Sequence, residues 1–221
     1  MSSRDDILGR VRAGLHRSAT NAAAAREVML AALSNRSHGP KPAFDSDPQA
    51  LLNRFRLKSE QQSSTVDIVA QEADVPAAIA RYLTTMKLPQ AAVAWPSLAA
   101  LDWAAAGLTV EGRGARDADL VGITGCFCAV AETGTLMLCS SADTPAAVSL
   151  LPETHIAMVH ASRILPYMED AWALARTELG SLPRAVNFIS GPSRTGDIEQ
   201  TIVLGAHGPY RVHLVIVENR L

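Results

Sequence analysis

Residues 65–96 read TVDIVAQEADVPAAIARYLTTMKLPQAAVAWP, and this stretch decides the class of fold. Residues 66–70 form a short apolar run that is typical of a strand, and residues 91–95 form another, which Pro96 ends. Residues 75–86 between them place apolar side chains on one face of a helix. Because a strand, a helix and a strand in succession indicate a parallel sheet covered by helices, we predict an α/β fold.

The alternation continues along the chain in both directions. We predict further strands at residues 109–111, 120–124, 154–160, 184–190 and 211–217, and helices at residues 98–106 and 166–179. Residues 126–139 hold two apolar runs around Glu132-Thr133-Gly134-Thr135, which predicts a β-hairpin inserted in the alternating pattern.

The first part of the chain is helical in a different way. Residues 3–16 and the alanine-rich residues 18–36 have helical patterns, and residues 37–42 read as a linker before a further helix at 48–61. We therefore divide the chain into a helical N-terminal extension with linker, residues 1–62, and an α/β domain, residues 63–221. The extension either wraps a neighbouring subunit, docks a partner or packs back on its own domain.

Composition excludes several classes of protein. A chain of 221 residues with 48% hydrophobic residues can bury the core of one domain. A net charge of −2 gives no electrostatic reason to expect nucleic acid or an anionic membrane as the partner. No apolar stretch is long enough for a membrane span, charged residues stand at positions 4–6, and three cysteines do not suggest a disulfide framework. We expect a cytoplasmic protein.

The segment Gly191 to Pro209 concentrates polar and glycine residues between two predicted strands. The spacing predicts a short helix that Thr195 or Asp197 caps and that ends at Gly205. The amide groups at such an N-terminus attract anions, so Ser193, Arg194 and Thr195 are candidates to bind a carboxylate or phosphate. The alternative is a well-capped helix with one surface arginine.

The same segment supplies candidates for proton transfer. Asp197 and Glu199 stand in the first turn of the predicted helix, where they either satisfy its dipole or act as acid and base groups beside a ligand. His207 lies between Gly205 and Gly208, and these glycines would let a ligand approach the backbone.

Residues 122–139 form the second candidate segment. Glu132, at a strand end beside a glycine, is a candidate nucleophile or general base, and the alternative is a surface carboxylate in a turn. Cys126, Cys128 and Cys139 do not predict a metal site, because a spacing of one residue is unusual for zinc and a fourth ligand is missing. The sequence has no Gly-x-Gly-x-x-Gly motif, no Walker phosphate loop and no cysteine-rich cluster motif, so we expect no iron–sulfur centre on this chain.

Five short motifs, in order, resemble those of one family. They are Gly122-Ile123-Thr124-Gly125, Ala131-Glu132-Thr133-Gly134-Thr135, Leu151-Pro152 with His155-Ile156, Gly191-Pro192-Ser193-Arg194-Thr195 with Asp197-Ile198-Glu199, and Leu204-Gly205-Ala206-His207-Gly208-Pro209. Together they resemble the lactate utilisation protein C (LutC/YkgG) family, which has a LUD domain. Phe127 departs from the family pattern, in which a polar residue is expected soon after Gly125.

The resemblance implies a Rossmann-like, mostly parallel sheet of the NagB/RpiA/CoA-transferase class. By analogy with that fold, the two glycine-containing segments would converge on one crevice, which adds Thr124, Gly125, Thr133 and Gly134 to the ligand-binding candidates. The resemblance also implies a role in oxidising L-lactate to pyruvate, with the iron–sulfur centres on partner proteins and no redox cofactor on this chain.

Two hypotheses follow. In the first, the protein is a non-catalytic subunit of an L-lactate oxidising complex that uses its N-terminal helices, which also offer a route to a homo-oligomer. In the second, the protein is itself an enzyme or a ligand sensor, which binds a small organic anion, a phosphorylated sugar, a CoA ester or a folate.

Overall fold

The computed structural model describes residues 3–16, 18–35, 39–196 and 202–218. The chain divides into two compact units, Met1–Pro42 and Ala43–Leu221. No helix of the described residues is long and apolar enough to cross a bilayer.

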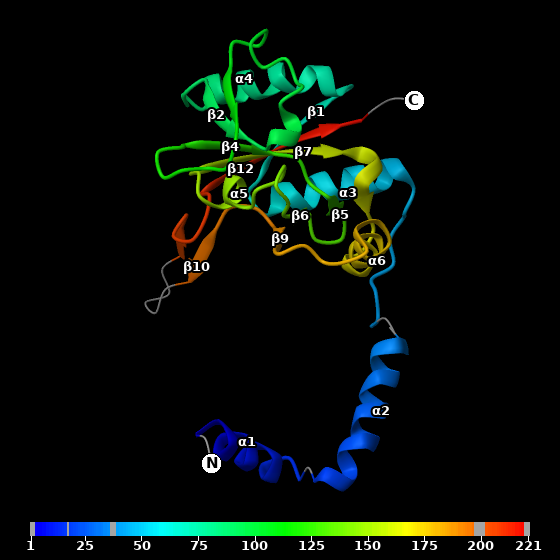
Figure 1. The fold of residues 1–221 in the computed structure, drawn as a ribbon. Helices are drawn as coiled ribbons and strands as arrows, with labels where there is room; N and C mark the ends of the chain where they lie inside the picture. Colours follow the sequence, from blue (N-terminus) through cyan, green and yellow to red (C-terminus); the bar gives the residue numbers. More distant parts are fainter. Residues whose placement is uncertain (1–2, 17, 36–38, 197–201, 219–221) are drawn as a thin grey trace. The chain divides into compact units, whose positions relative to one another are not determined.

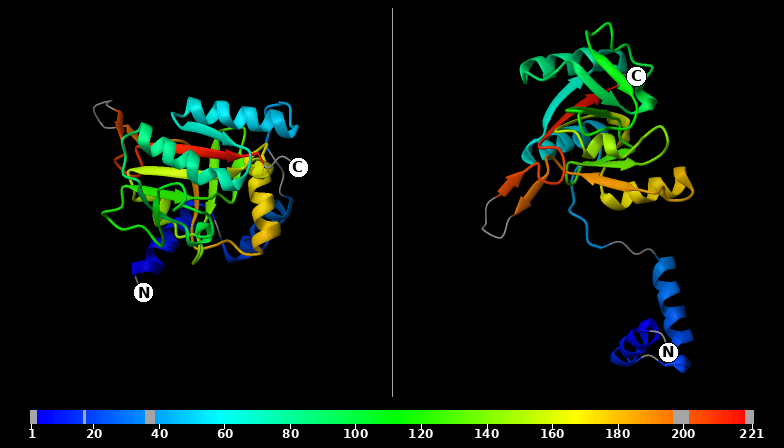
Figure 2. Two further views of the ribbon diagram at one scale, coloured as in Figure 1. Left: turned by 90° about the horizontal axis from the view of Figure 1, so that it is seen from above. Right: turned by 60° about the vertical axis from the view of Figure 1, so that its left-hand side comes forward.

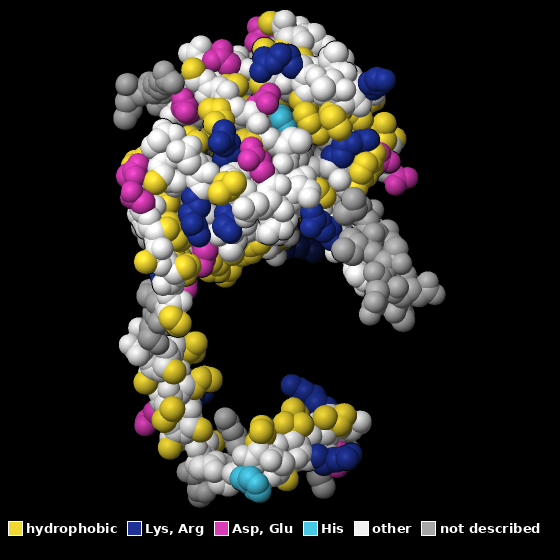
Figure 3. All heavy atoms as spheres, turned by 180° about the vertical axis from the view of Figure 1, so that it is seen from behind, with side chains coloured by type: hydrophobic (Ala, Val, Ile, Leu, Met, Phe, Trp, Pro, Cys, Tyr) yellow, Lys and Arg dark blue, Asp and Glu magenta, His cyan; other side chains and the backbone are white. Residues whose placement is uncertain are grey.

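The first unit contains two helices, α1 (Ser3–Gly14) and α2 (Ala19–Asn35). In α1, Asp5 and Asp6 in the first turn and Arg12 in the last turn complement the helix dipole. Both helices expose large apolar side chains, namely Ile7, Val11, Val28, Met29, Leu30 and Leu33, and Leu15 directly after α1 is exposed too. Figure 3 shows hydrophobic side chains, in yellow, along both helices. The described side chains of these helices therefore do not form a core of their own.

Helix α3 (Pro48–Gln61) belongs to the second unit. Asp47 caps it, since its carboxylate accepts hydrogen bonds from the amides of Gln49 and Ala50, each 3.0 Å long. Leu51, Leu52 and Phe55 are buried in the core of the α/β unit. The sequence predicts this helix as part of the N-terminal extension, whereas its packing joins it to the sheet.

A six-stranded sheet forms the centre of the second unit, and all its strand pairs are parallel. Its order is β1 (Thr65–Val69), β12 (Arg211–Val217), β7 (Thr154–His160), β4 (Val121–Thr124), β2 (Ala91–Ala94) and β3 (Thr109–Gly112). Most side chains of β4, β7 and β12 are buried, as expected of strands covered on both faces. The predicted parallel α/β fold is confirmed.

Helices and a second sheet cover the two faces of this sheet (Figure 1). Helix α4 (Val75–Thr85) lies on one face, while α3 and α5 (Ala147–Leu150) lie on the other. Short 3-10 helices, η1 (Glu72–Asp74), η2 (Pro96–Leu98) and η3 (Ala161–Arg163), follow β1, β2 and β7.

The second sheet is built around the predicted hairpin. Its order is β8 (Ile164–Leu165), β5 (Cys128–Val130), β6 (Thr135–Cys139) and β9 (Val186–Ile189), and β5 and β6 pair antiparallel. Helix α6 (Met168–Leu179) packs on it through Ala171 and Ala175. The inserted hairpin is therefore confirmed.

The helix predicted after Thr195 is wrong. Residues Arg194–Gly196 form β10, which pairs antiparallel with β11 (Ile202–Leu204), and Figure 2 shows this hairpin extending away from the six-stranded sheet. The pairing of β10 with β11 satisfies backbone N–H and C=O groups that would otherwise form the hydrogen bonds of a helix. In addition, Ile202 and Val203 are β-branched residues, which favour strands. Gly205 has a φ of 78° and ends β11, not a helix.

The helix predicted at residues 98–106 is also wrong. The 3-10 helix η2 ends at Leu98, and the chain then continues in turns to β3. Side chains bond the local backbone here: Asp102 accepts from the amide of Ala105 at 3.1 Å, and the Trp103 indole donates to the Leu98 carbonyl at 3.1 Å. Such bonds compete with helix formation.

Candidate functional site

A cavity of about 490 Å³ in the α/β unit lies where the parallel strands end. Trp95 and Gly125 directly follow β2 and β4, and Met158 and His160 are near the end of β7. In the sheet, β3 lies on one side of β2, whereas β4 lies on the other side of β2 and β7 lies beyond β4. The direction in which successive strands are added to the sheet therefore reverses between β2 and β4. Open α/β sheets bind ligands at such a reversal, outside the carboxyl ends of the strands.

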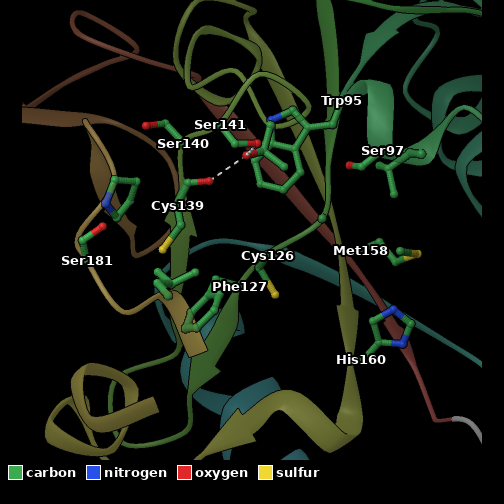
Figure 4. A pocket seen from close by; sticks show the side chains of 15 residues that line it. Trp95, Ser97, Cys126, Phe127, Cys139, Ser140, Ser141, Met158, His160 and Ser181 are labelled. Carbon is green, nitrogen blue, oxygen red and sulfur yellow. Dashed lines mark hydrogen bonds between the residues drawn. The ribbon is translucent and has the colours of Figure 1, made fainter. Parts of the chain in front are cut away.

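The walls of this carboxyl-edge cavity are mainly apolar. The apolar side chains are Trp95, Leu98, Phe127, Met158, Leu179 and Pro183. Hydroxyl groups come from Ser97, Ser140, Ser141, Thr144 and Ser181, and the one imidazole comes from His160. The thiols of Cys126 and Cys139 and the backbone of Gly125 complete the wall. Figure 4 shows these side chains around the open space. No Lys, Arg, Asp or Glu is among the described residues that line it.

Two aromatic rings in the wall are fixed by bonds outside the cavity. The Trp95 indole donates to the Pro145 carbonyl at 3.1 Å, and this residue is only 4% exposed. Phe127 is held from behind by Arg163, which donates to the Phe127 carbonyl at 2.9 Å and places its guanidinium 4.9 Å from the ring centre. The rings therefore form a preorganised surface.

Arg163 also ties the cavity wall to helix α6. Its two terminal nitrogens donate to the carboxylate of Glu178 at 2.7 and 2.8 Å, a bidentate geometry. These bonds hold the pKa of Glu178 below its ordinary value and raise the pKa of Arg163. Both groups are therefore charged at neutral pH and serve as a fixed support for Phe127.

The thiols in and beside the cavity are neutral. Burial raises the pKa of Cys126 and of Cys128 to about 12, and it raises the pKa of Cys139 above its ordinary value. Because the thiolate is the nucleophile and the metal ligand, these cysteines are not activated for either role. Within the described residues, no group of three or more His, Cys, Asp or Glu side chains is arranged to hold a metal ion.

His160 is the one ionisable side chain among the described lining residues other than the thiols. Its Nε2 lies 3.0 Å from a carboxylate oxygen of Glu72, which belongs to η1. A carboxylate beside an imidazole fixes the orientation of the ring. The pair places a titratable group at the end of β7.

Of the residues predicted in the segment 122–135, Gly125 lines the cavity. Thr124 does not, since its side chain is buried and its Oγ1 is 2.8 Å from Nε2 of His155. Glu132, Thr133 and Gly134 form the turn of the β5–β6 hairpin, whereas the cavity lies at the hairpin's open end, beside Cys126 and Cys139.

Thr135 and Arg194 make their contacts away from this cavity. Thr135 Oγ1 lies 2.6 Å from the hydroxyl of Ser190, and Arg194 donates to the Gln62 carbonyl at 3.3 Å and to the hydroxyl of Ser63. Gln62 and Ser63 connect α3 to the start of β1, so this Arg194 cluster lies near the amino ends of the parallel strands. Ser190 precedes the predicted segment 191–209, and Arg194 contacts Gln62 and Ser63, so the convergence of the two segments on one crevice stays a prediction.

The remaining predicted residues occupy a third place or are not described. Gly205, His207 and Gly208 line a separate cavity of about 370 Å³, together with residues that precede β7 and β12. Ser193 is joined to this loop, since its amide donates to the Pro209 carbonyl and its carbonyl accepts from the amide of Gly205. Thr195 pairs with Val203 in the β10–β11 hairpin. Asp197 and Glu199 lie outside the described residues.

Sequence reasoning missed most of the cavity wall. Trp95 and His160 are not among the predicted site residues. The available signal was their position at strand ends, since Trp95 follows β2 directly and His160 is the last residue of β7. Ser140 and Ser141 carried no comparable signal, because only the pairing of β6 with β9 brings them to this edge.

The family model described as LUD domain matches residues 97–217 of this chain. All cavity-lining residues except Trp95 fall within that range. The chain is also similar to a DUF162 family protein of solved structure from Deinococcus radiodurans, with a TM-score of 0.59 and 22% identity, covering 79% of this chain and 100% of that one. This likeness supports the fold.

Curated relatives carry one name. The chain is 40% identical over 103 residues to "Lactate utilization protein C" of Bacillus licheniformis and 42% identical over 103 residues to the protein of that name of Bacillus subtilis, in both cases over 45% of this chain and 43% of the relative. It is 42% identical over 109 residues to "Lactate utilization protein C 1" of Bacillus mycoides, over 48% of this chain and 46% of the relative. The matched region thus spans less than half the length of these relatives. Because the family model covers more than half of the chain, the chain belongs to the LUD domain family.

Proposed function

We propose that this protein is a component of L-lactate utilisation, acting with iron–sulfur partner proteins in the oxidation of L-lactate to pyruvate. The observation that carries the proposal is the position of the carboxyl-edge cavity, which lies almost wholly within the matched LUD domain of a chain whose curated relatives are named for lactate utilisation. The electrons released by lactate would pass to the partner proteins, since we assign no redox cofactor to this chain.

Growth on L-lactate tests this role. Deleting the gene in the protein's own organism should abolish growth on L-lactate and leave growth on glucose unchanged. Gly125→Leu, which adds a side chain in the cavity beside Trp95, should fail to restore growth on L-lactate. Gly114→Leu is the control, because a Cβ there would meet only Pro145 at 3.9 Å. Undiminished growth of the deletion strain on L-lactate would refute the proposal.

A small organic anion, with lactate as the first candidate, is proposed to bind at the Arg194 cluster. Support comes from the guanidinium of Arg194, which donates to the hydroxyl of Ser63 and to the carbonyl of Gln62. An arginine beside hydroxyl groups suits a carboxylate. Calorimetric titration with L-lactate and pyruvate should give binding that Arg194→Ala removes and that Arg184→Ala, an exposed arginine on another loop, retains. Binding that survives Arg194→Ala would place the anion elsewhere.

A stand-alone enzyme or ligand sensor of the NagB/RpiA/CoA-transferase class is the second candidate. The separate cavity that Gly205, His207 and Gly208 line favours it, because glycines let a ligand approach the backbone. Titration with phosphorylated sugars, CoA esters and folates distinguishes the two candidates, since only the second expects one of these ligands to bind.

A further inference from the structure

We propose that the carboxyl-edge cavity binds the flat, uncharged, carbonyl-bearing ring of a quinone. This ligand goes beyond the proposed function, which assigns an anion to the Arg194 cluster at the other edge of the sheet. The argument rests on the size, the walls and the charge of the cavity.

The size of the cavity excludes lactate as its natural occupant. A volume of about 490 Å³ is within the range of roughly 300–1,000 Å³ that is typical of pockets for drug-sized ligands and cofactors. Lactate would leave most of this space to water. An aromatic or quinoid ring with substituents fills it.

The walls suit a flat ring. Trp95 is anchored through its indole to the Pro145 carbonyl, and Phe127 is backed by Arg163. Met158 adds a polarisable thioether to the same cavity. Flat apolar groups gain from stacking on aromatic faces that are already ordered, because no side-chain freedom is lost on binding.

The charge of the walls separates a quinone from other flat cofactors. Nicotinamide and flavin nucleotides carry phosphates, which proteins hold with lysine, arginine or the N-terminus of a helix. The described lining residues include no lysine and no arginine, and the cysteines there are held as neutral thiols. Ligands that carry a carboxylate are also disfavoured, because the described lining residues offer no lysine or arginine to pair with it.

Hydroxyl groups in the wall can bond quinone carbonyls. Ser140 and Ser141 follow β6 at one side of the cavity, and Ser97 and Ser181 stand on other segments around it (Figure 4). Ser140 accepts from the amide of Ala185 and keeps its own hydrogen, whereas Ser141 donates to Thr144, whose hydrogen goes to the Cys139 carbonyl. Ser140, Ser97 and Ser181 can each donate one hydrogen bond, which is the partner a carbonyl oxygen needs when water is displaced. The wall therefore combines stacking surface with donors, and its described residues include no Lys, Arg, Asp or Glu.

Equilibrium dialysis with duroquinone tests the proposal on the full-length protein. This quinone is suitable because its fully methylated ring does not add to thiols, and quenching of the protein's tryptophan fluorescence provides a second readout. We expect binding to the unchanged protein and at least tenfold weaker binding to Gly125→Leu. Gly114→Leu should bind as the unchanged protein does.

Ser181→Phe is the second cavity variant. Ser181 is an exposed residue in the cavity wall, so the added ring narrows the cavity without entering the core. Loss of duroquinone binding in both cavity variants, with an unchanged circular dichroism spectrum, supports the proposal. It is overturned if the unchanged protein does not bind duroquinone, if both variants bind it equally well, or if L-lactate displaces it competitively from the cavity. A deletion strain that cannot grow on L-lactate, combined with no duroquinone binding, would reject the quinone and leave the proposed function standing.

Discussion

His155 and His213 are buried on the neighbouring strands β7 and β12, and each is bonded to a threonine. His155 Nε2 lies 2.8 Å from Thr124 Oγ1, and His213 Nδ1 lies 2.8 Å from Thr65 Oγ1. His213 also stacks on Tyr82 of α4, with ring centres 3.9 Å apart. Burial lowers the pKa of both imidazoles to about 4, so both are neutral at physiological pH.

These two histidines predict a loss of stability in mild acid. The pKa of an imidazole is about 6.5 in an unfolded chain, so the unfolded chain takes up protons first as the pH falls. The free energy of unfolding should therefore decrease between about pH 6.5 and pH 4, by about 2 kcal/mol per histidine at pH 5. Urea unfolding at pH 7.5 and at pH 5 measures this decrease. From pH 7.5 to pH 5, the free energy of unfolding should fall by about 2 kcal/mol less in His155→Gln than in the unchanged protein. His207→Gln, at an exposed histidine, is the control, and an unaltered difference in His155→Gln would contradict the prediction.

At the scale of elements, the turn of the β5–β6 hairpin packs directly against the end of α3. Gly134 has a φ of 68°, and a Cβ there would lie 2.6 Å from the backbone nitrogen of Ser59 and 2.7 Å from the carbonyl carbon of Lys58. Ser59 Oγ donates to the Gly134 carbonyl at 3.4 Å. The glycine that suggested ligand access in the sequence therefore serves the contact between a helix and a hairpin.

Gly134→Ala should lower the free energy of unfolding by about 3 kcal/mol, from backbone strain and from displacement of α3. Gly180→Ala is the matched control, because Gly180 has a φ of 67° with nothing within 4 Å of its added Cβ. That variant should lose only about 1 kcal/mol, the cost of strain alone. Equal losses in urea unfolding of the two variants would show that the α3 contact contributes nothing.

At the scale of the whole molecule, the division of the chain into two compact units predicts that the α/β unit is stable without the first unit. Helix α1 has no buried residue, so its removal takes no side chain from a core. A chain of residues 43–221 should melt within about 1 °C of the full chain, because the free energy of unfolding of the α/β unit is unchanged. Calorimetric melting of both chains measures this, and a substantially lower melting temperature of the shorter chain would mean that the first unit stabilises the second.

The strand and helix alternation was predictable because local apolar runs set it, as residues 66–70, 75–86 and 91–95 illustrate. The site was not, because it depends on which strands pair. Gly125 and Trp95 become neighbours only when β4 pairs with β2, whereas Glu132 is carried to the far end of a hairpin that ends against α3. The helix predicted in 191–209 failed for a similar reason, since pairing between β10 and β11 overrode the capping residues.

The place of β12 between β1 and β7 has a consequence for synthesis of the chain. In the described sheet β1 pairs only with β12, so the first strand to leave the ribosome has no sheet partner until residues 211–217 follow. At translation rates of roughly 5–20 residues per second, that wait is on the order of ten seconds. During that time the backbone groups of β1 and one edge of β7 are unpaired, which makes the nascent chain a substrate for chaperones and gives the final strand the role of closing the sheet.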